Sequence, residues 1–174
     1  MRGSAKCVCS VFLCLILLGL SLPAAAQGKA DLGVGYNFQR ISDPHESENL
    51  PGGWVANLAV NLTDMFAVVG EVTGNYKTIE GTKAKVHLFS GGVQVRPKGT
   101  AKAKPFVRVM VGDANLSASE CSECGDNNVH FQVGGGVSCW TSPRLGVEFF
   151  ANFIRITGDA DTNALGMGAT LLIH

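Results

Sequence analysis

The segment from Val129 to Ile156 alternates between apolar and polar residues with a period of two. One face of its first arm carries Val129, Phe131, Val133, Gly135, Val137 and Cys139. The other face carries His130, Gln132, Gly134, Gly136 and Ser138. Thr141-Ser142-Pro143 interrupts the pattern, which then resumes with Leu145, Val147, Phe149, Ala151 and Phe153. This alternation predicts two antiparallel strands joined by a tight turn.

The polar face of this hairpin is rich in glycine and poor in lysine, which is unusual for a face turned to water. Its apolar face continues for about ten residues, and a transmembrane β-strand needs roughly 9–11. The pattern therefore indicates apolar side chains turned to lipid and small polar side chains turned into a narrow lumen.

The same alternation recurs along the chain. We expect six further strands, with apolar faces at 32–38, 54–62, 66–76, 89–95, 107–111 and 165–173. The strand that contains Leu88 is less regular, because Leu88 falls on the polar face. Polar segments at 41–53, 77–82, 113–128 and 157–163 are expected to be loops, whereas Thr63-Asp64 and the turn before Leu145 are very short.

The connections therefore alternate between longer polar loops and shorter turns, as in outer-membrane barrels. An even number of strands also lets a sheet close without free edges, which a bilayer requires. The predicted fold is all-β: an eight-stranded antiparallel up-and-down transmembrane β-barrel.

Residues 1–26 have the features of a cleaved signal peptide. Arg2 and Lys6 precede an apolar run, and Ala24-Ala25-Ala26 supplies a small-residue cleavage site. We therefore predict a signal peptide at 1–26 and one barrel domain at 27–174. The segment at 1–26 holds 2 of the 14 basic residues and none of the 14 acidic ones, so the mature formal charge is 12 − 14 = −2.

Composition and residue spacing limit the classes of partner and cofactor that this chain is expected to bind. The mature chain lacks a basic stripe, so nucleic acid is not an expected partner. Cys121 and Cys124 form a CxxC without a second pair, and in an exported protein a small loop disulfide is the simplest interpretation. His45 lies in a polar loop and His130 on the luminal face, but neither belongs to a spaced catalytic or metal-binding set. We expect no catalytic residue, metal or cofactor.

Two groups of residues fit the interior and the rim of such a barrel. The charges expected inside are Glu71, Arg96, Arg108 and Glu148. An eight-stranded barrel has an interior just wide enough for side chains, so these charges should pair and plug the lumen. Arg96, beside Pro97, could instead lie at a strand end in solvent. The aromatic residues expected at the membrane interfaces are Phe38, Trp54, Phe66, Tyr76 and Phe153.

Four segments carry a resemblance to a known family: Gly33–Phe38 (GVGYNF), Gly91–Pro97 (GGVQVRP), Lys104–Gly112 (KPFVRVMVG) and Phe131–Phe149. They resemble the eight-stranded bacterial outer-membrane β-barrels, which include the membrane domain of outer membrane protein A and the opacity-type barrels. The resemblance implies a place in the bacterial outer membrane, with lipid and the barrel assembly machinery as partners. Family members commonly end in an aromatic assembly signal, whereas this sequence ends Leu172-Ile173-His174. Without a peptidoglycan-binding domain after the barrel, the usual tethering role is not carried over.

The leading functional hypothesis is a non-enzymatic, monomeric outer-membrane barrel with a structural or surface-interaction role, which binds any external ligand through its loops. A narrow pore is a variant of this hypothesis. A secreted lipocalin-like barrel is an alternative, in which the Val and Leu faces would point inward to a small apolar ligand. An enzyme on a barrel scaffold is a third possibility.

Overall fold

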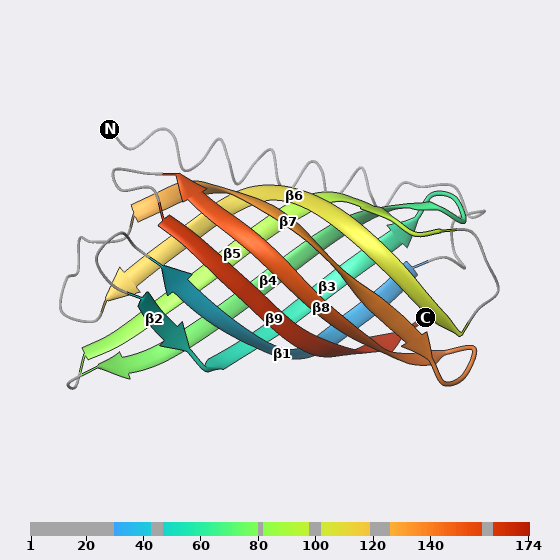
Figure 1. Cartoon of the computed structure of the whole chain (residues 1–174), viewed down its shortest axis with the longest axis horizontal. Coiled ribbons are helices and arrows are strands. Elements are labelled where there is room, and N and C mark those ends of the chain that lie inside the picture. The colour runs from blue at the N-terminus through green and yellow to red at the C-terminus, as the bar shows by residue number, and fades with distance from the viewer. Residues whose placement is uncertain (1–29, 43–46, 80–81, 98–101, 119–125, 158–161) are drawn as a thin grey trace.

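The computed structural model describes residues 30–42, 47–79, 82–97, 102–118, 126–157 and 162–174, and these form one closed antiparallel sheet. The strands are β1 (Ala30–Ser42), β2 (Ser47–Leu50), β3 (Gly52–Asn61), β4 (Phe66–Ile79), β5 (Thr82–Val95), β6 (Ala103–Ala118), β7 (Asp126–Trp140), β8 (Leu145–Thr157) and β9 (Thr162–Ile173). β2 and β3 both pair with β1, each strand from β3 to β9 pairs with the next in chain order, and β1 also pairs with β9, which closes the barrel (Figure 1). The predicted all-β, eight-stranded barrel is confirmed.

The short strand β2 does not make the barrel nine-stranded, because β2 and β3 pair with successive parts of β1. Tyr36 pairs with Trp54 and Gln39 pairs with Leu50, so two residues of β1 face three residues of the partner strand. This offset is a β-bulge, and it falls at Pro51, which has no N–H to donate to a ladder. The predicted loop at 41–53 is therefore wrong over most of its length.

Other strands also continue beyond their predicted ends. Lys77 pairs with Ala84, within a predicted loop, and β6 and β7 extend to Ala118 and from Asp126 into the predicted loop at 113–128. The sequence pattern could not reveal these extensions, because a polar segment continues a strand wherever a partner strand runs beside it. Only two residues, 80–81, separate β4 from β5, so this connection is shorter than the predicted loop at 77–82.

The two ends of the barrel differ. The turn end holds the turns at 62–65 and 141–144, together with Ala30 and Ile173, and lies to the right in Figure 1. The other end, here called the loop end, holds the strand ends at Ser42, Ile79, Ala118 and Thr157. The turns are closed by backbone hydrogen bonds such as Leu62 N–H to Phe66 O, at 2.9 Å. Among the described residues, no helix is long and apolar enough to cross a membrane.

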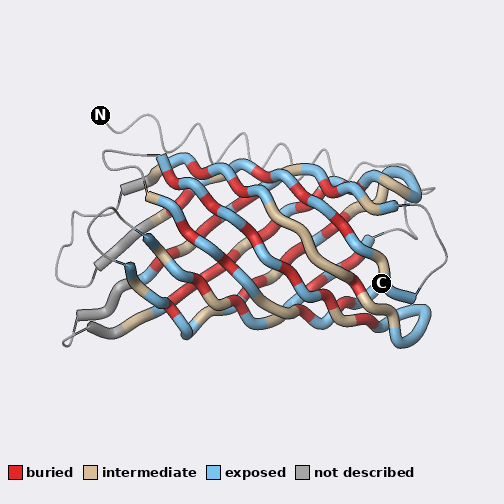
Figure 2. The backbone as a smooth tube through the Cα atoms, viewed as in Figure 1, coloured by how far each residue is buried: buried red, intermediate tan, exposed pale blue. Residues whose placement is uncertain are grey.

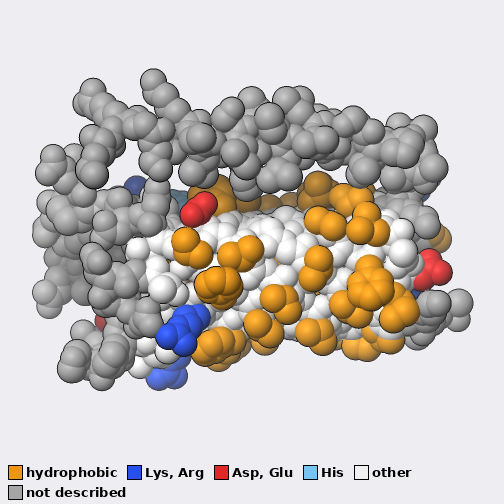
Figure 3. All heavy atoms as spheres, turned by 90° about the horizontal axis from the view of Figure 1, so that it is seen from above, with side chains coloured by type: hydrophobic (Ala, Val, Ile, Leu, Met, Phe, Trp, Pro, Cys, Tyr) orange, Lys and Arg blue, Asp and Glu red, His pale blue; other side chains and the backbone are white. Residues whose placement is uncertain are grey.

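Burial alternates along most of the described length of the strands, as the red and pale-blue segments of Figure 2 show. The predicted outward faces are confirmed: Leu32 is 45% exposed and Val107 is 59% exposed, whereas Arg108, between two outward valines, is 1% exposed. Leu88 points inward, as expected from its position. Hydrophobic side chains cover the middle of the face seen in Figure 3. The lipocalin-like alternative is wrong, because it requires the Val and Leu faces inside.

The inside-outside pattern inverts near the loop end. There, inward positions are apolar and form a cluster, here called the loop-end core: Leu50, Val86, Leu88, Ala114, Ile154, Ile156 and Ala164, with Ile41 against it. Outward positions at the same level include the polar residues Arg40, Lys85, Asp113 and Arg155, next to the last apolar residues of the outer face, such as Val129 and Leu165. This is the polarity of a soluble barrel, so the strands extend past the lipid-facing belt. The sequence analysis did not predict this extension.

Candidate functional site

The middle of the lumen holds a buried charged layer around Arg108. Its Nη2 atom lies 2.9 Å from Glu71 Oε2, and its Nη1 atom lies 3.8 Å from Glu148 Oε1. Arg108 Nε also donates to Asn152 Oδ1 at 3.2 Å. An unpaired charge in such an interior is costly, and here two carboxylates share one guanidinium.

Neutral side chains complete the layer. Gln132 Nε2 donates to Glu71 Oε1 at 2.9 Å, and Ser138 Oγ donates to Glu148 Oε2 at 3.0 Å. Each carboxylate therefore has a neutral donor in addition to Arg108. The sequence placed Glu71, Arg108 and Glu148 inside the barrel, and the structure brings these three together.

Two phenylalanine rings enclose the guanidinium of Arg108. Its Cζ atom lies 4.9 Å from the ring centroid of Phe150 and 5.7 Å from that of Phe106, both within the range of cation–π attraction. The rings lie against bare backbone: a Cβ added to Gly136 would be 2.8 Å from Phe106 Cζ, and one added to Gly168 would be 2.7 Å from Phe150 Cζ. The glycine-rich luminal face is thus filled by aromatic rings, which its alternation pattern did not reveal.

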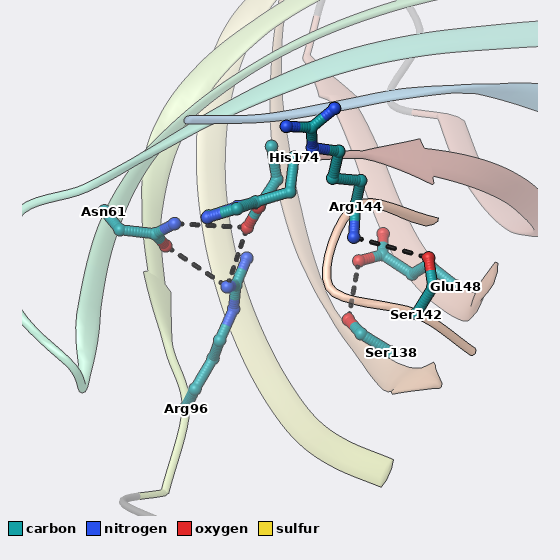
Figure 4. A network of polar contacts seen from close by, with 8 residues as sticks. Asn61, Arg96, Ser138, Ser142, Arg144, Glu148 and His174 are labelled. Carbon is teal, nitrogen blue, oxygen red and sulfur yellow. Dashed lines mark hydrogen bonds and ion pairs between the residues drawn. The ribbon is translucent and has the colours of Figure 1, made fainter. Parts of the chain in front are cut away.

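Arg96 belongs to a separate cluster at the turn end. Its Nη1 atom donates to Asp31 Oδ2 at 3.0 Å and to Asn61 Oδ1 at 3.1 Å, while Asn61 Nδ2 donates to the same Asp31 oxygen at 3.1 Å. His174 Nδ1 lies 2.6 Å from Asp31 Oδ1 (Figure 4). The side chain of Arg96 is 11% exposed, so it is neither free in solvent nor paired with Glu71. Asp31 was recognisable as a partner only by its place on the inward face of the first strand.

Above the charged layer, Ser90 and His130 form a buried pair. Their Oγ and Nε2 atoms lie 2.8 Å apart across β6, where Gly112 is the residue that pairs with both. His130 is fully buried, and its next inward neighbours toward the loop end belong to the loop-end core. Asn37, Gln39 and Asn75 form a further polar chain, with Asn75 Nδ2 donating to Gln39 Oε1 at 2.7 Å.

Several buried polar atoms have no hydrogen-bond partner among the described protein groups: Gln39 Nε2, Asn57 Nδ2, Thr73 Oγ1, His130 Nδ1 and Thr170 Oγ1. Buried polar groups of this kind are normally satisfied by ordered water. The described residues contain no group of three or more His, Cys, Asp or Glu side chains that could hold a metal ion. Cys121, Cys124, His45 and the predicted signal peptide lie outside the described residues.

The expected interfacial aromatics point away from the lumen. Trp54, Phe66, Tyr76 and Phe153 are 40%, 50%, 41% and 53% exposed, and Phe38 is partly buried on the same outer face. Trp54 Nε1 donates to Tyr76 Oη at 3.2 Å, and that hydroxyl lies 3.2 Å from His87 Nε2. His87 is a member of this group that the sequence analysis missed, because no residue pattern marks it.

Comparison with known proteins gives structural relatives only. No family model matches the sequence, and no curated protein matches it. The structure is similar to that of Neisserial surface protein A, at 10% identity and a TM-score of 0.71, over 83% of this chain and 96% of that one. It is also similar to Ail of Yersinia pestis, solved in complex with the heparin analogue sucrose octasulfate, at 14% identity and a TM-score of 0.59, over 84% and 99%.

A third similar structure is the N-terminal β-barrel domain of Pseudomonas aeruginosa OprF, at 9% identity and a TM-score of 0.53, over 84% of this chain and all of that one. These comparisons and the apolar belt together give one result. The chain has the fold of the eight-stranded bacterial outer-membrane barrels, with its hydrophobic outer face in lipid and its polar face in the lumen.

Proposed function

We propose that this protein is a non-catalytic, monomeric outer-membrane barrel with a plugged lumen and a surface-interaction role carried by its loop end. The arrangement of Arg108 between Glu71 and Glu148 is the main support, because it places a paired and enclosed ion cluster across the middle of the barrel. The charges expected at 71, 108 and 148 thus act as a structural plug. As with other barrels of this fold, the assembly machinery would insert the chain.

Two further layers support a plugged lumen. The turn-end cluster joins Asp31 to Arg96 and His174 at one end of the barrel, and Figure 4 shows Asn61, Arg96 and His174 pointing toward one another. The loop-end core fills the other end with apolar side chains, six of which are at most 3% exposed. A hydrated ion would lose its shell against such a core, so each end opposes permeation in a different way.

The extension at the loop end supports the surface role. Its apolar core holds β1, β2, β5, β6, β8 and β9 together beyond the lipid-facing belt. Binding residues are often carried by loops that a rigid scaffold positions. The complex of Yersinia pestis Ail with sucrose octasulfate shows that a barrel of this fold can carry a ligand.

A catalytic role has one candidate pair among the described residues, Ser90 and His130. Both side chains are buried between the charged layer and the loop-end core, at 6% and 0% exposure, which disfavours access by a substrate. A nucleophile needs an accessible reacting atom beside it. We assign this pair to packing of the lumen.

Conductance in planar bilayers tests the plug directly. The purified full chain, shown to be folded by its gel shift on heating, should give no current steps, whereas an open porin in the same bilayer gives them. Steady single-channel steps would overturn the plug and favour the narrow pore. The narrow pore is supported by buried polar atoms that have no protein partner and would be hydrogen-bonded by water in the lumen, namely those of Gln39, Asn57, Thr73 and Thr170.

The surface role has its own test. Residues 119–125 and 158–161 are replaced by Gly-Ser segments of equal length, and binding of whole expressing cells to host-type surfaces and sulfated saccharides is measured. We expect binding to fall while the heat-dependent gel shift is unchanged. Equal binding by the parent and the replaced chains would contradict a role for these loops.

A further inference from the structure

A groove crosses the lipid-facing surface of β3, β4 and β5. It has a volume of about 290 Å³, and its outward-facing lining is Leu32, Ala56, Leu58, Gly70, Val72 and Phe89. Gly70 pairs with Gly91 across β4 and β5, and a Cβ on either glycine would meet nothing within 4 Å. The two glycines therefore leave a hollow between the large apolar side chains that line the groove.

A polar cluster lies on the same strands, directly toward the loop end from this groove. We call it the boundary cluster: Trp54, Tyr76, Lys85 and His87. The indole of Trp54 lies over Gly74, where an added Cβ would be 2.5 Å from Nε1, and it donates to Tyr76 Oη at 3.2 Å. The rings of Tyr76 and His87 meet edge to face at 5.6 Å.

The boundary cluster is basic and open to the surroundings. Lys85 is exposed and pairs with Tyr76, and His87 lies two residues away on the same face of β5. The nearest outward acidic residue in the register is Asp113 on β6, which pairs with Phe89 and not with either basic residue. Basic groups beside an aromatic pair suit a phosphate, since Lys and His donate to its oxygens and Trp and Tyr favour the membrane interface.

The spacing between groove and cluster matches one leaflet of a bilayer. Gly70 and Tyr76 are six residues apart on β4, which is about 20 Å along a strand. At a tilt of roughly 45° this gives ~14 Å along the membrane normal, close to half of a hydrocarbon core of about 30 Å. The groove thus lies near the bilayer centre and the cluster near the headgroups.

We propose that β3, β4 and β5 form a binding site for one membrane lipid with a phosphate-bearing headgroup. One acyl chain lies in the groove over Gly70 and Gly91, and the phosphate is held by Lys85, His87 and the Tyr76 hydroxyl. This proposal rests on the outer-membrane placement of the barrel but not on the plugged lumen or the loops. The lipid belongs to the leaflet at the loop end.

Native mass spectrometry of the full chain tests this site, with dioleoylphosphatidylglycerol as the probe. Dioleoylglycerol is the matched lipid without phosphate, and inorganic phosphate is the matched anion without chains. We expect one phosphatidylglycerol per barrel to be retained and the other two probes to be lost. Retention of dioleoylglycerol to the same extent would overturn the headgroup contacts, and retention of phosphate alone would overturn the groove.

Substitutions locate the site. Gly70→Leu with Gly91→Leu fills the groove, and Lys85→Gln removes a basic residue, for which a fivefold loss of affinity is expected from the roughly 1 kcal/mol of a basic group near an anionic surface. Val133→Leu, on the lipid-facing side of β7, and Arg40→Gln, an exposed basic residue on β1, are the matched controls. Equal retention by all four would overturn the proposal.

Two controls distinguish a loss of lipid binding from misfolding and from a failure of the plugged-lumen proposal. Every variant is first checked by its gel shift on heating, and Lys85→Gln changes only an exposed side chain, so it remains informative if the groove variant does not fold. If the parent chain retains no lipid and gives no current steps in planar bilayers, the lipid site is contradicted and the plugged lumen is not. If the chain gives current steps and retains lipid as expected, the plugged lumen is contradicted and the lipid site is not.

Discussion

The guanidinium of Arg108 lies 2.9 Å from the carboxylate of Glu71, and both side chains are 1% exposed. These residues are 37 positions apart in the sequence and lie on strands that are not neighbours, β4 and β6. The pair therefore crosses the inner face of β5 and is not a contact between adjacent strands. Its burial means that the barrel depends on both members being present.

Replacing Arg108 should test that dependence. Arg108→Met leaves Glu71 and Glu148 without their shared cation, and we expect the free energy of unfolding to fall by about 3–5 kcal/mol. Urea unfolding in lipid vesicles, followed by the gel shift, measures it. Arg40→Met is the control on the outer face and should change stability by less than about 0.5 kcal/mol.

The triple variant Arg108→Met, Glu71→Gln and Glu148→Gln should regain much of the lost stability, because no unpaired charge remains in the lumen. If Arg108→Met is as stable as Arg40→Met, the charged layer does not hold the barrel together.

The luminal glycines give a second prediction. In Gly136→Ala the new Cβ would be 2.0 Å from Phe149 O and 2.8 Å from Phe106 Cζ, so the backbone and the ring must both shift. Overpacking of this kind costs about 1–3 kcal/mol, measured by the same unfolding assay. Gly70→Ala is the matched control, since its Cβ has nothing within 4 Å. Similar losses in the two variants would show that the bare wall at Gly136 is not required.

The loop-end core should behave like the core of a soluble protein. Leu88 is 1% exposed within it, and Leu88→Ala should lower the free energy of unfolding by roughly 2–5 kcal/mol, because a cavity remains. Val109 is 51% exposed on the lipid face, and Val109→Ala should cost far less, since lipid replaces the lost contacts. A larger loss in Val109→Ala would contradict an apolar core inside the extension.

Cysteine labelling can locate the edge of the lipid-facing belt. In a background with Cys121→Ser, Cys124→Ser and Cys139→Ala, Lys85→Cys and Asp113→Cys should react with a water-soluble maleimide in intact vesicles. Val109→Cys and Phe149→Cys should stay unlabelled, because they lie within the apolar belt. Protection of positions 85 and 113 would place the extension inside the membrane.

The sequence analysis succeeded where the direction of a side chain depends only on whether that residue prefers lipid or the lumen. Leu32 and Val107 face lipid and Arg108 faces the lumen because of their own polarity, and the alternation needs no knowledge of neighbouring strands. The interior was harder to predict. Phe150 falls on the inward face of the alternation, but the pattern does not show that its ring packs over the guanidinium of Arg108.

The partner of Arg96 shows why contacts could not be predicted. Asp31 is 65 residues away and meets Arg96 because the antiparallel order β1-β3-β4-β5 places the start of β1 and the end of β5 at the same end of the barrel. Glu71 is chemically as suitable, but the register of the strands places it at the level of Arg108.

The sequence by itself determined that this chain is a barrel of eight strands with an apolar outer face, because lipid and lumen select residues locally and with a period of two. Only the tertiary structure decided which luminal charges pair, where the strands leave the lipid-facing belt, and that a groove lies below Trp54 and His87. These features depend on strand register and closure, which place residues from distant parts of the chain at one level of the barrel.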